Sequence, residues 1–498
     1  MRRVLALLLV ALAGLAVPGG ETSAAPRREV PVRALDPRTL PLGHDGRWFT
    51  DAYGRVVILH GVNMVAKLPP YDPGKMGFGA DDARFLASEG FNTVRLGLIY
   101  KGLEPERGRY RRDYLERIAR LARMLGRHGL HVLADFHQDL FNERFHGEGF
   151  PDWAVIDDGL PNQPDLGFPG NYFAMPALWR AFDHFWANDP GPDGVGLQDA
   201  YAQAWRVAAT RLRREPAVFG YDLLNEAWPG SQYPSCINPV GCPVWEASLG
   251  PFYERVIGEI RKVDRRKIVF YETHPVFGSG TMTFLPDTGD ERAGFSWHMY
   301  CLGSTVGIPG GVLGPAACPL GVDRPYENAD AHSETTGDAL LLSEFGATDA
   351  LDEITRDVEA ADRHMMSWQY WSYFGRDPSG ERPVEGIVHD IRKPPAGDNL
   401  KQEKLNLLAR AYPRAVAGVP LSWSFAATAP DRAFEFSYRT DPAIRAPTEV
   451  VLPPRHYPHD YSVEVTGPAR VVSGRGAPIL KLRTTGPGTV TITVTASH

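Results

Sequence analysis

The chain has few cysteines, no surplus of basic residues and, beyond its N-terminus, no long apolar run. Only four cysteines occur among 498 residues and none forms a C-x-x-C pair, which argues against a zinc knuckle. The formal net charge of -7 argues against nucleic acid as a partner, because phosphate binding requires a basic face. No G-x-G-x-x-G motif follows an early apolar run, which disfavours a dinucleotide-binding sheet.

The N-terminus carries the one extended apolar run. Arg2 and Arg3 precede the run Val4–Val17, and small residues follow around Ser23–Ala25. A charged start, a short apolar stretch and a small-residue cleavage zone are typical of a signal peptide, and the run is short for a bilayer span. We expect residues 1–25 to be a signal peptide and the mature protein to be secreted and extracellular. A retained membrane anchor is the alternative.

The four cysteines fit an exported protein. Cys236, Cys242, Cys301 and Cys318 lie in segments rich in glycine and proline. Three pairings are open. We favour the local pairs, Cys236 with Cys242 and Cys301 with Cys318, which would staple two loops.

Short apolar runs alternate with longer amphipathic segments through most of the chain. Each run has the length of a strand buried on both faces, and segments such as Tyr114–His128 place apolar residues on one helical face. After a lead-in of residues 26–45, this pattern predicts an α/β fold, a (β/α)₈ TIM barrel, over residues 46–413. An open doubly wound sheet is the alternative. The eight runs are Val56–Gly61, Asn92–Leu98, His131–Phe136, Gly220–Leu224, Ile268–Tyr271, Gly294–Tyr300, Ala339–Phe345 and Ser367–Tyr373.

The pattern changes after residue 413. The segment Ala411–Pro420 has the composition of a connector, and the residues beyond it alternate apolar and polar without a helical pattern. Residues 414–498 are therefore predicted to form a small all-β sandwich. Carbohydrate or lipid binding and purely structural packing are both open roles for it. The expected strands are Ser422–Ala426, Ala433–Tyr438, Glu449–Leu452, Tyr461–Thr466, Ile479–Thr484 and Thr489–Ala496.

Two of the predicted barrel strands lead into glutamates. Asn225 and Glu226 follow the fourth run, and Glu344 ends the seventh. Catalytic side chains of such barrels lie at the C-terminal ends of the strands, so the two carboxyl groups can face each other. A retaining glycosidase needs one carboxylic acid to protonate the leaving oxygen and one carboxylate to attack the anomeric carbon. Either glutamate alone could be a salt-bridged strand end, but together they favour catalysis.

Further strand-end residues complete a resemblance to glycoside hydrolase family 5 that extends over nearly the whole barrel. By this resemblance Glu226 is the acid/base and Glu344 the nucleophile. The family is retaining and needs no metal or organic cofactor, so we expect none. The matching residues are Arg95, His137, Asn225, Glu226, His298, Tyr300, Glu344 and Trp371.

The resemblance implies roles for the side chains around the two glutamates. Asn225 can hydrogen-bond the sugar 2-hydroxyl, a contact that strengthens in the transition state. Arg95 and Tyr300 can keep the nucleophile ionised by donating to it. For Arg95 a purely structural ion pair is the alternative.

Three aromatic residues are expected to contact the sugar. His137 and His298 can fix hydroxyl groups or the acid/base, and Trp371 offers an apolar face to a sugar ring. The alternative for each of the three is an ordinary place in the core.

Within the family the sequence resembles the endoglycoceramidases, which cleave the bond between glycan and ceramide in glycosphingolipids. The resemblance rests on His60–Lys67, Asp135–Leu140 and Gly147–Ala154. It implies that Lys67 and Asp139 bind the sugar next to ceramide. The position of the C-terminal β module is also typical of that branch.

The residues themselves add a weaker indication of a lipid substrate. The segments Trp228–Leu249 and Cys301–Leu320 are apolar and rich in proline, and both follow barrel strands on the catalytic face. They could also pack only on each other. We expect a monomer that binds a glycosphingolipid and contacts lipid or a membrane surface transiently. A family 5 β-glucanase or β-mannanase, and a catalytically dead binding protein, are the competing hypotheses.

Overall fold

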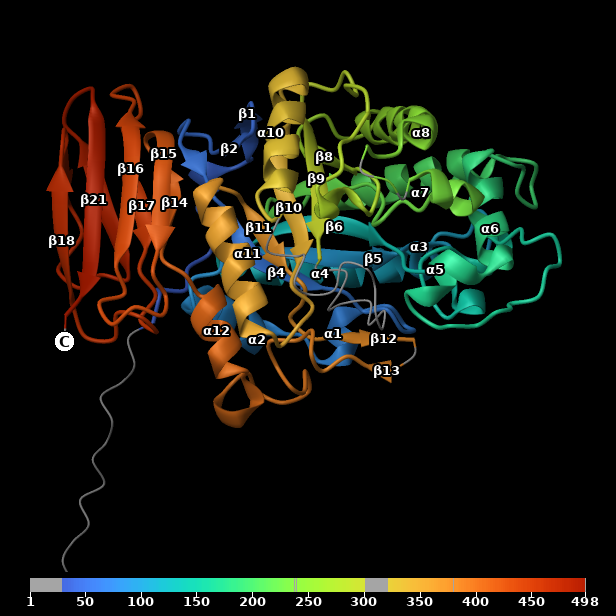
Figure 1. Ribbon diagram of the computed structural model, residues 1–498, viewed down its shortest axis with the longest axis horizontal. Helices are drawn as coiled ribbons and strands as arrows, with labels where there is room; N and C mark the ends of the chain where they lie inside the picture. Colours follow the sequence, from blue (N-terminus) through green and yellow to red (C-terminus); the bar gives the residue numbers. More distant parts are fainter. Residues whose placement is uncertain (1–28, 237, 239, 301–320, 379, 498) are drawn as a thin grey trace, which may run out of the picture.

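The computed structural model describes residues 29–497, apart from residues 237, 239, 301–320 and 379 (Figure 1). Its centre is a closed barrel of eight parallel strands in the order β10-β11-β4-β5-β6-β7-β8-β9. The predicted TIM barrel is thereby confirmed. The barrel strands are β4 (His60–Met64), β5 (Thr93–Ile99), β6 (His131–His137), β7 (Val218–Asp222), β8 (Ile268–Glu272), β9 (Ala293–Met299), β10 (Ala339–Phe345) and β11 (Trp368–Tyr370).

Helices surround the barrel. In α4 (Arg112–Arg127) the apolar residues Leu115, Ile118, Ala122 and Leu125 are buried, as their spacing of three and four residues predicts for one helical face. Among the described residues no helix is long and apolar enough to cross a membrane. The other helices are α1 (Pro73–Met76), α2 (Ala80–Ser88), α3 (Tyr100–Leu103), α5 (Gly170–Ala174), α6 (Pro176–Trp186), α7 (Leu197–Leu212), α8 (Pro243–Arg261), α10 (Arg324–Thr336), α11 (Leu351–Arg363) and α12 (Gln402–Leu408).

Two antiparallel sheets form a sandwich beside the barrel, at the red end of the chain in Figure 1. One sheet has the order β1-β2-β3-β14-β17-β20-β19 and the other the order β15-β16-β21-β18. The predicted C-terminal β module is confirmed. Its strands are β14 (Tyr412–Val416), β15 (Gly418–Phe425), β16 (Phe434–Thr440), β17 (Thr448–Val451), β18 (Tyr461–Thr466), β19 (Ala469–Val471), β20 (Ile479–Thr484) and β21 (Thr489–Ala496), joined by β1 (Gly43–Asp45), β2 (Trp48–Thr50) and β3 (Val56–Val57). A short hairpin, β12 (Arg376–Asp377) and β13 (Gly380–Glu381), lies apart from both sheets.

The N-terminal boundary of the barrel differs from the expected one. Strand β3 pairs antiparallel with β14, so β1 to β3 belong to the sheet of the module although residues from 46 onward were assigned to the barrel. The run Val56–Gly61 was expected to be one barrel strand, but it supplies β3 and then the start of β4. Both parts are apolar and buried, so hydrophobicity alone gives no sign of the break.

We expect a connector at Ala411–Pro420 from its composition, and this prediction is wrong. The segment forms β14 and the start of β15. Proline is tolerated on the edge of a sheet and at bulges. Strand β15 is an edge strand, and its register shifts between Pro420 and Ser422. The module packs on the barrel through α11, where the indole N–H of Trp423 donates to Asp362 at 2.9 Å.

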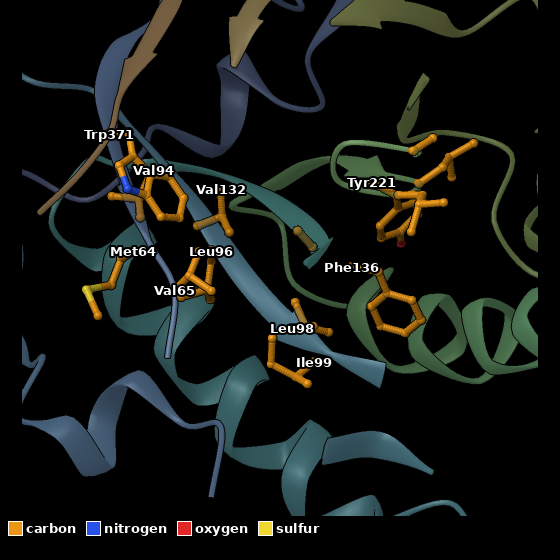
Figure 2. Packing of buried hydrophobic residues seen from close by; sticks show 14 of the residues in the cluster. Met64, Val65, Val94, Leu96, Leu98, Ile99, Val132, Phe136, Tyr221 and Trp371 are labelled. Carbon is orange, nitrogen blue, oxygen red and sulfur yellow. The ribbon is translucent and has the colours of Figure 1, made fainter. Parts of the chain in front are cut away.

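The outer faces of the barrel strands are apolar. Figure 2 shows Val94, Leu96 and Leu98 of β5 clustered near Val132 and Phe136 of β6. All five are at most 1% exposed and belong to the core between strands and helices. The alternating residues of β5, including Arg95, therefore point into the barrel.

The interior of the barrel is divided into an apolar end and a charged end. At the N-terminal ends of the strands, Phe270 packs against Phe219 and against Phe49 of β2, with ring centroids 5.9 and 6.0 Å apart. Gly294 leaves room for this ring, because a Cβ there would lie 2.5 Å from it. Two residues beyond Phe270, β8 ends in Glu272, and the charged residues of the interior gather at this opposite end.

The described disulfide lies in a loop on the catalytic face. Cys236 and Cys242 are bonded, which confirms one of the two favoured local pairs. The expected pair Cys301 with Cys318 falls outside the described residues, as does the expected signal peptide.

Candidate active site

Glu226 and Glu344 meet at the C-terminal end of the barrel. Glu226 follows β7 and Glu344 lies on β10. One carboxylate oxygen of each glutamate and one ring nitrogen of His298 lie within 4.8 Å of one another. The structure therefore brings together the two glutamates that the sequence singled out.

Hydrogen-bond donors surround Glu344. The Tyr300 hydroxyl donates to its Oε2 at 2.6 Å, and the Arg95 guanidinium donates to its Oε1. Burial, together with the carboxylates of Glu344 and Glu226, raises the pKa of Tyr300 well above its ordinary value, so the hydroxyl keeps its proton. Donors of this kind favour an ionised carboxylate.

Glu226 lies in a different environment. Its Oε1 is 2.8 Å from Nδ1 of His298, and its side chain is 18% exposed against 5% for Glu344. Burial raises the pKa of Glu226 above its ordinary value, and the carboxylate of Glu344 adds to this rise while His298 opposes it. The two carboxyl groups thus lie in different environments: Glu344 accepts from Tyr300 and Arg95, whereas Glu226 is more exposed and contacts His298.

Arg95 is the centre of a buried polar network. It is fully buried, and its Nη2 donates to the Oδ1 atom of Asn225 at 2.9 Å. The Asn225 amide donates in turn to the backbone oxygen of Gln138 at 3.0 Å. Arg95 therefore makes structural ion pairs and also contacts the candidate site. Its further partners are Asn63, Asp135, Asp222 and Glu272.

A second group of predicted residues lies beside the glutamates. Lys67 forms an ion pair with Asp139, and its Nζ lies 4.6 Å from the centroid of the Trp371 ring. The His137 ring stacks on Trp371 at 5.2 Å, and its Nδ1 donates to Oδ2 of Asp135 at 2.9 Å. Burial lowers the pKa of His137, but the neighbouring carboxylates outweigh it and raise the value to about 9.

Three acids near the site were not predicted from the sequence: Glu272 and Glu148, which are buried, and Glu385, which is half-buried. Glu272 ends β8, but the predicted fifth strand stopped at Tyr271, one residue earlier. Glu148 lies 3.8 Å from Lys67 and falls within the segment Gly147–Ala154, but it was not among the predicted site residues. Glu385 accepts a hydrogen bond from the indole N–H of Trp371 at 2.9 Å, and its loop carries no sequence signal. Side chains alternate between the two faces of a strand, so Glu272 points into the barrel like Phe270. This alternation could have identified Glu272 from the sequence.

Two clusters of the described residues have the composition and spacing of metal ligands. One is His137 with Asp139 and Glu148, and the other is the group around Glu226 and Glu344. Protein cations already contact both clusters, because Lys67 pairs with Asp139 and Arg95 pairs with Glu344. A metal ion would have to displace or repel these cations.

A closed parallel barrel with two carboxyl groups this close at its C-terminal end has the architecture of a glycoside hydrolase. The chain matches the cellulase family (glycosyl hydrolase family 5) over residues 51–377. Residues 410–494 match the glycoside hydrolase family 5 C-terminal domain. The chain belongs to glycoside hydrolase family 5, as its motifs predicted.

Several relatives of the chain are endoglycoceramidases. It is 33% identical over 460 residues to endoglycoceramidase I of Rhodococcus hoagii (strain 103S), an alignment that spans 90% of this chain and 87% of the relative. The ganglioside GM3 complex of endo-glycoceramidase II from Rhodococcus sp. superimposes with a TM-score of 0.74 at 30% identity, over 90% of this chain and 98% of that chain. A lactosyl-enzyme intermediate of the same enzyme gives 0.72 at 29% identity, over 94% and 100%. The predicted endoglycoceramidase branch is confirmed.

Proposed function

We propose that this protein is a secreted, monomeric, retaining endoglycoceramidase that hydrolyses the bond between the glycan and the ceramide of glycosphingolipids. The observation that carries the proposal is the pair of carboxyl groups, with oxygens within 4.8 Å, at the C-terminal end of a family 5 barrel. A separation of about 5 Å is typical of retaining enzymes, whereas inverting enzymes keep the two groups further apart. The lactosyl-enzyme intermediate of the Rhodococcus relative supports the same mechanism.

In the first step Glu344 is the nucleophile and Glu226 the acid. A Glu344 oxygen attacks the anomeric carbon while the Glu226 carboxyl group gives its proton to the glycosidic oxygen. The bond between the anomeric carbon and this oxygen breaks, ceramide leaves as an alcohol and the glycan is held on Glu344 as an ester. Arg95 and Tyr300 stabilise the ionised nucleophile until it attacks.

In the second step Glu226, now a carboxylate, takes a proton from water. The water oxygen attacks the anomeric carbon, the ester bond breaks, and Glu344 leaves as a carboxylate. The intact oligosaccharide is released with the configuration of the substrate. His298 lies against the Glu226 carboxyl group and orients it in both steps.

The glycan is bound on the side of Lys67, Asp139, His137 and Trp371. The ammonium and the carboxylate offer a donor and acceptors for sugar hydroxyl groups, and Asn225 lies next to the acid/base, in reach of the 2-hydroxyl. Trp371 supplies an apolar face, and His137 holds its ring parallel to this indole.

A lipid aglycone is supported by the apolar surface around this end of the barrel. Residues 227–245 and 273–286, after β7 and β8, contain no lysine, arginine, aspartate or glutamate. On the catalytic face, the exposed large apolar residues among those described are leucine, valine, methionine and phenylalanine. A polysaccharide site would instead be rich in exposed tryptophan and tyrosine. The exposed apolar residues of this face are Leu166, Val240, Val244, Met282, Phe284 and Val384. The same surface fits transient contact with lipid or a membrane.

Product analysis tests the proposal. The secreted protein is incubated with a detergent-dispersed ganglioside, a lactosyl lipid, a 6-gala-series lipid and a soluble β-glucan, with Glu344→Gln as the inactive control. Release of an intact oligosaccharide and ceramide is expected, and cleavage of the glucan alone would refute the lipid substrate. N-terminal sequencing of the exported protein tests the signal peptide, and its molar mass in solution tests the monomer.

A further inference from the structure

Glu272 is a buried carboxylate that neither step of the proposed reaction consumes. It ends β8, is 2% exposed and contacts three groups: the backbone N–H of Glu226, the guanidinium of Arg95 and the ring of His298. We propose that Glu272 is a positioning residue that fixes the backbone and the imidazole partner of Glu226, and thereby sets the pH range in which Glu226 works. This inference rests on the acid/base role proposed for Glu226.

The first contact holds the main chain of Glu226. The Glu226 backbone has a φ of +43°, a left-handed conformation that is unfavourable for any residue other than glycine. Its N–H donates to Oε2 of Glu272 at 2.8 Å, and its carbonyl accepts from Nε2 of Gln138 at 3.0 Å. The buried side chains of Glu272 and Gln138 therefore hold the two peptide groups that flank the Glu226 Cα in this conformation.

The second contact selects the charged form of His298. Its Nε2 lies 3.2 Å from Oε1 of Glu272, and its Nδ1 lies 2.8 Å from Oε1 of Glu226. While Glu226 is ionised, a neutral imidazole can present its single N–H to only one of these carboxylates, whereas an imidazolium presents an N–H to each. Burial lowers the pKa of His298, but Glu272 and Glu344 outweigh it and raise the value well above the ordinary range.

The third contact keeps Glu272 itself ionised. Burial would raise the pKa of Glu272, but the charges of His298 and Arg95 lower it below its ordinary value. Arg95 keeps other carboxylate partners if Glu272 is neutralised, so the loss of charge acts mainly on His298. The titratable groups that face Glu272 and His298 from the neighbouring elements are Arg95, Asp222, Glu226, Tyr253, Tyr300 and Glu344.

The substitution Glu272→Gln tests the proposal. We expect His298 to lose its charge at a lower pH, so that Glu226 loses a cation at 2.8 Å and its pKa rises. The alkaline limb of the pH profile of kcat/KM should then move up by about one pH unit, and kcat/KM at the wild-type optimum should fall about tenfold. A purely structural role would lower the activity without moving this limb.

A matched control is Glu246→Gln. Glu246 is a fully buried acid of α8 whose side chain accepts from Thr273, Thr283 and the backbone of Phe284, away from His298. Its substitution should leave the alkaline limb in place. An unmoved limb in folded Glu272→Gln protein overturns the proposal.

A second measurement needs neither the variant nor a glycolipid. Nitrogen NMR of histidine-labelled wild-type protein, with His298→Gln for assignment, should show the imidazolium of His298 at pH 7.5. A neutral ring at that pH overturns the proposal. The pH profiles are recorded with a soluble alkyl β-glycoside, whose poorly acidic alcohol leaves only with a proton from Glu226. Failure to cleave glycosphingolipids would therefore refute the proposed substrate but leave the test of Glu272 intact.

Discussion

The catalytic end of the barrel and the C-terminal β-sandwich bury opposite kinds of side chain. In the described part of the sandwich, residues 414–497, the buried polar residues are Thr440, Thr448, Glu449 and His456. Glu449 is paired there with Arg414 and Lys481. The charged or titratable residues buried at the catalytic end include Lys67, Arg95, Asp135, His137, Asp139, Glu148, Asp222, Glu272, His298 and Glu344.

The difference separates what stabilises the molecule from what gives it chemistry. Burial of a charge costs free energy unless the charge is paired and hydrogen-bonded, and even a paired buried charge is weak evidence for stability. The sandwich instead alternates buried Phe434, Phe436 and Tyr438 with more exposed residues, as in an ordinary two-layer core. Substitutions at the barrel end should therefore change rates, and substitutions in the sandwich should change stability.

The largest effect on the reaction rate is expected at Glu344, at the catalytic end of the barrel. Glu344→Gln removes the nucleophile but keeps nearly the same shape, so kcat should fall by about 10⁴-fold or more while substrate binding persists. Steady-state kinetics and calorimetric titration with a glycolipid measure the two quantities. Retention of more than a tenth of the activity would refute the nucleophile assignment.

The substitution Glu226→Ala should distinguish the role of the acid from the role of the nucleophile. Loss of the acid should lower kcat on a glycolipid about 10³-fold, because the ceramide alcohol leaves poorly without a proton. An aryl glycoside with an acidic phenol needs no such proton, so the formation of the glycosyl-enzyme should be nearly unchanged. A burst of phenol in rapid-mixing experiments measures this step, and an equal loss with both substrates would contradict the assignment.

Much of this contrast could be predicted from the sequence. The apolar runs gave the barrel strands to within a few residues, because strands buried on both faces are continuously hydrophobic. The alternation in Ala433–Tyr438 likewise gave β16. The strands β14 and β19 were missed: β14 contains Pro413 within an apparent connector, and β19 has only three residues.

Site residues could be predicted where a strand end belongs to a recognisable motif. They could not be predicted where a residue acts only through tertiary contacts. Glu226 and Glu344 stand at strand ends in a motif, whereas Glu385 reaches Trp371 from a loop that the sequence does not place. Asp222 and Asp135 were visible in their strands, but their convergence on Arg95 depends on the closed barrel. The register of neighbouring strands, which no local pattern encodes, decides those contacts.

Phe436→Ala tests the sandwich side of the comparison. Phe436 is 1% exposed and stacks on Tyr438 at 5.1 Å, so truncation should lower the free energy of unfolding of the module by about 3–5 kcal/mol. Because no described residue of the module contacts Glu226 or Glu344, kcat at 25 °C should stay within about twofold. Urea unfolding followed by fluorescence measures the first quantity. A large loss of kcat in folded protein would give the module a role in catalysis.

The smallest expected effect concerns two buried histidines whose contributions to stability depend on pH in opposite directions. In the barrel, the pKa of His137 is about 9, because nearby carboxylates outweigh the lowering effect of burial. In the sandwich, burial and the nearby arginines lower the pKa of His456 to about 3. His137 is therefore charged in the folded protein at neutral pH, whereas His456 is neutral.

Because the pKa of each histidine differs between the folded and unfolded states, each contributes stability in its own pH range. The stability from His137 is fully present below its unfolded pKa of about 6.5 and is lost, by about 3 kcal/mol, as the pH rises to about 9. The stability from neutral His456 is present above about 6.5 and is lost as the pH falls toward 3. Urea unfolding of His137→Gln and His456→Gln between pH 5 and pH 9 should show the first deficit shrinking with rising pH and the second shrinking with falling pH. If the two losses of unfolding free energy had the same pH dependence, the barrel end would not hold His137 as a cation. The charge contrast between the two regions would then not extend to their histidines.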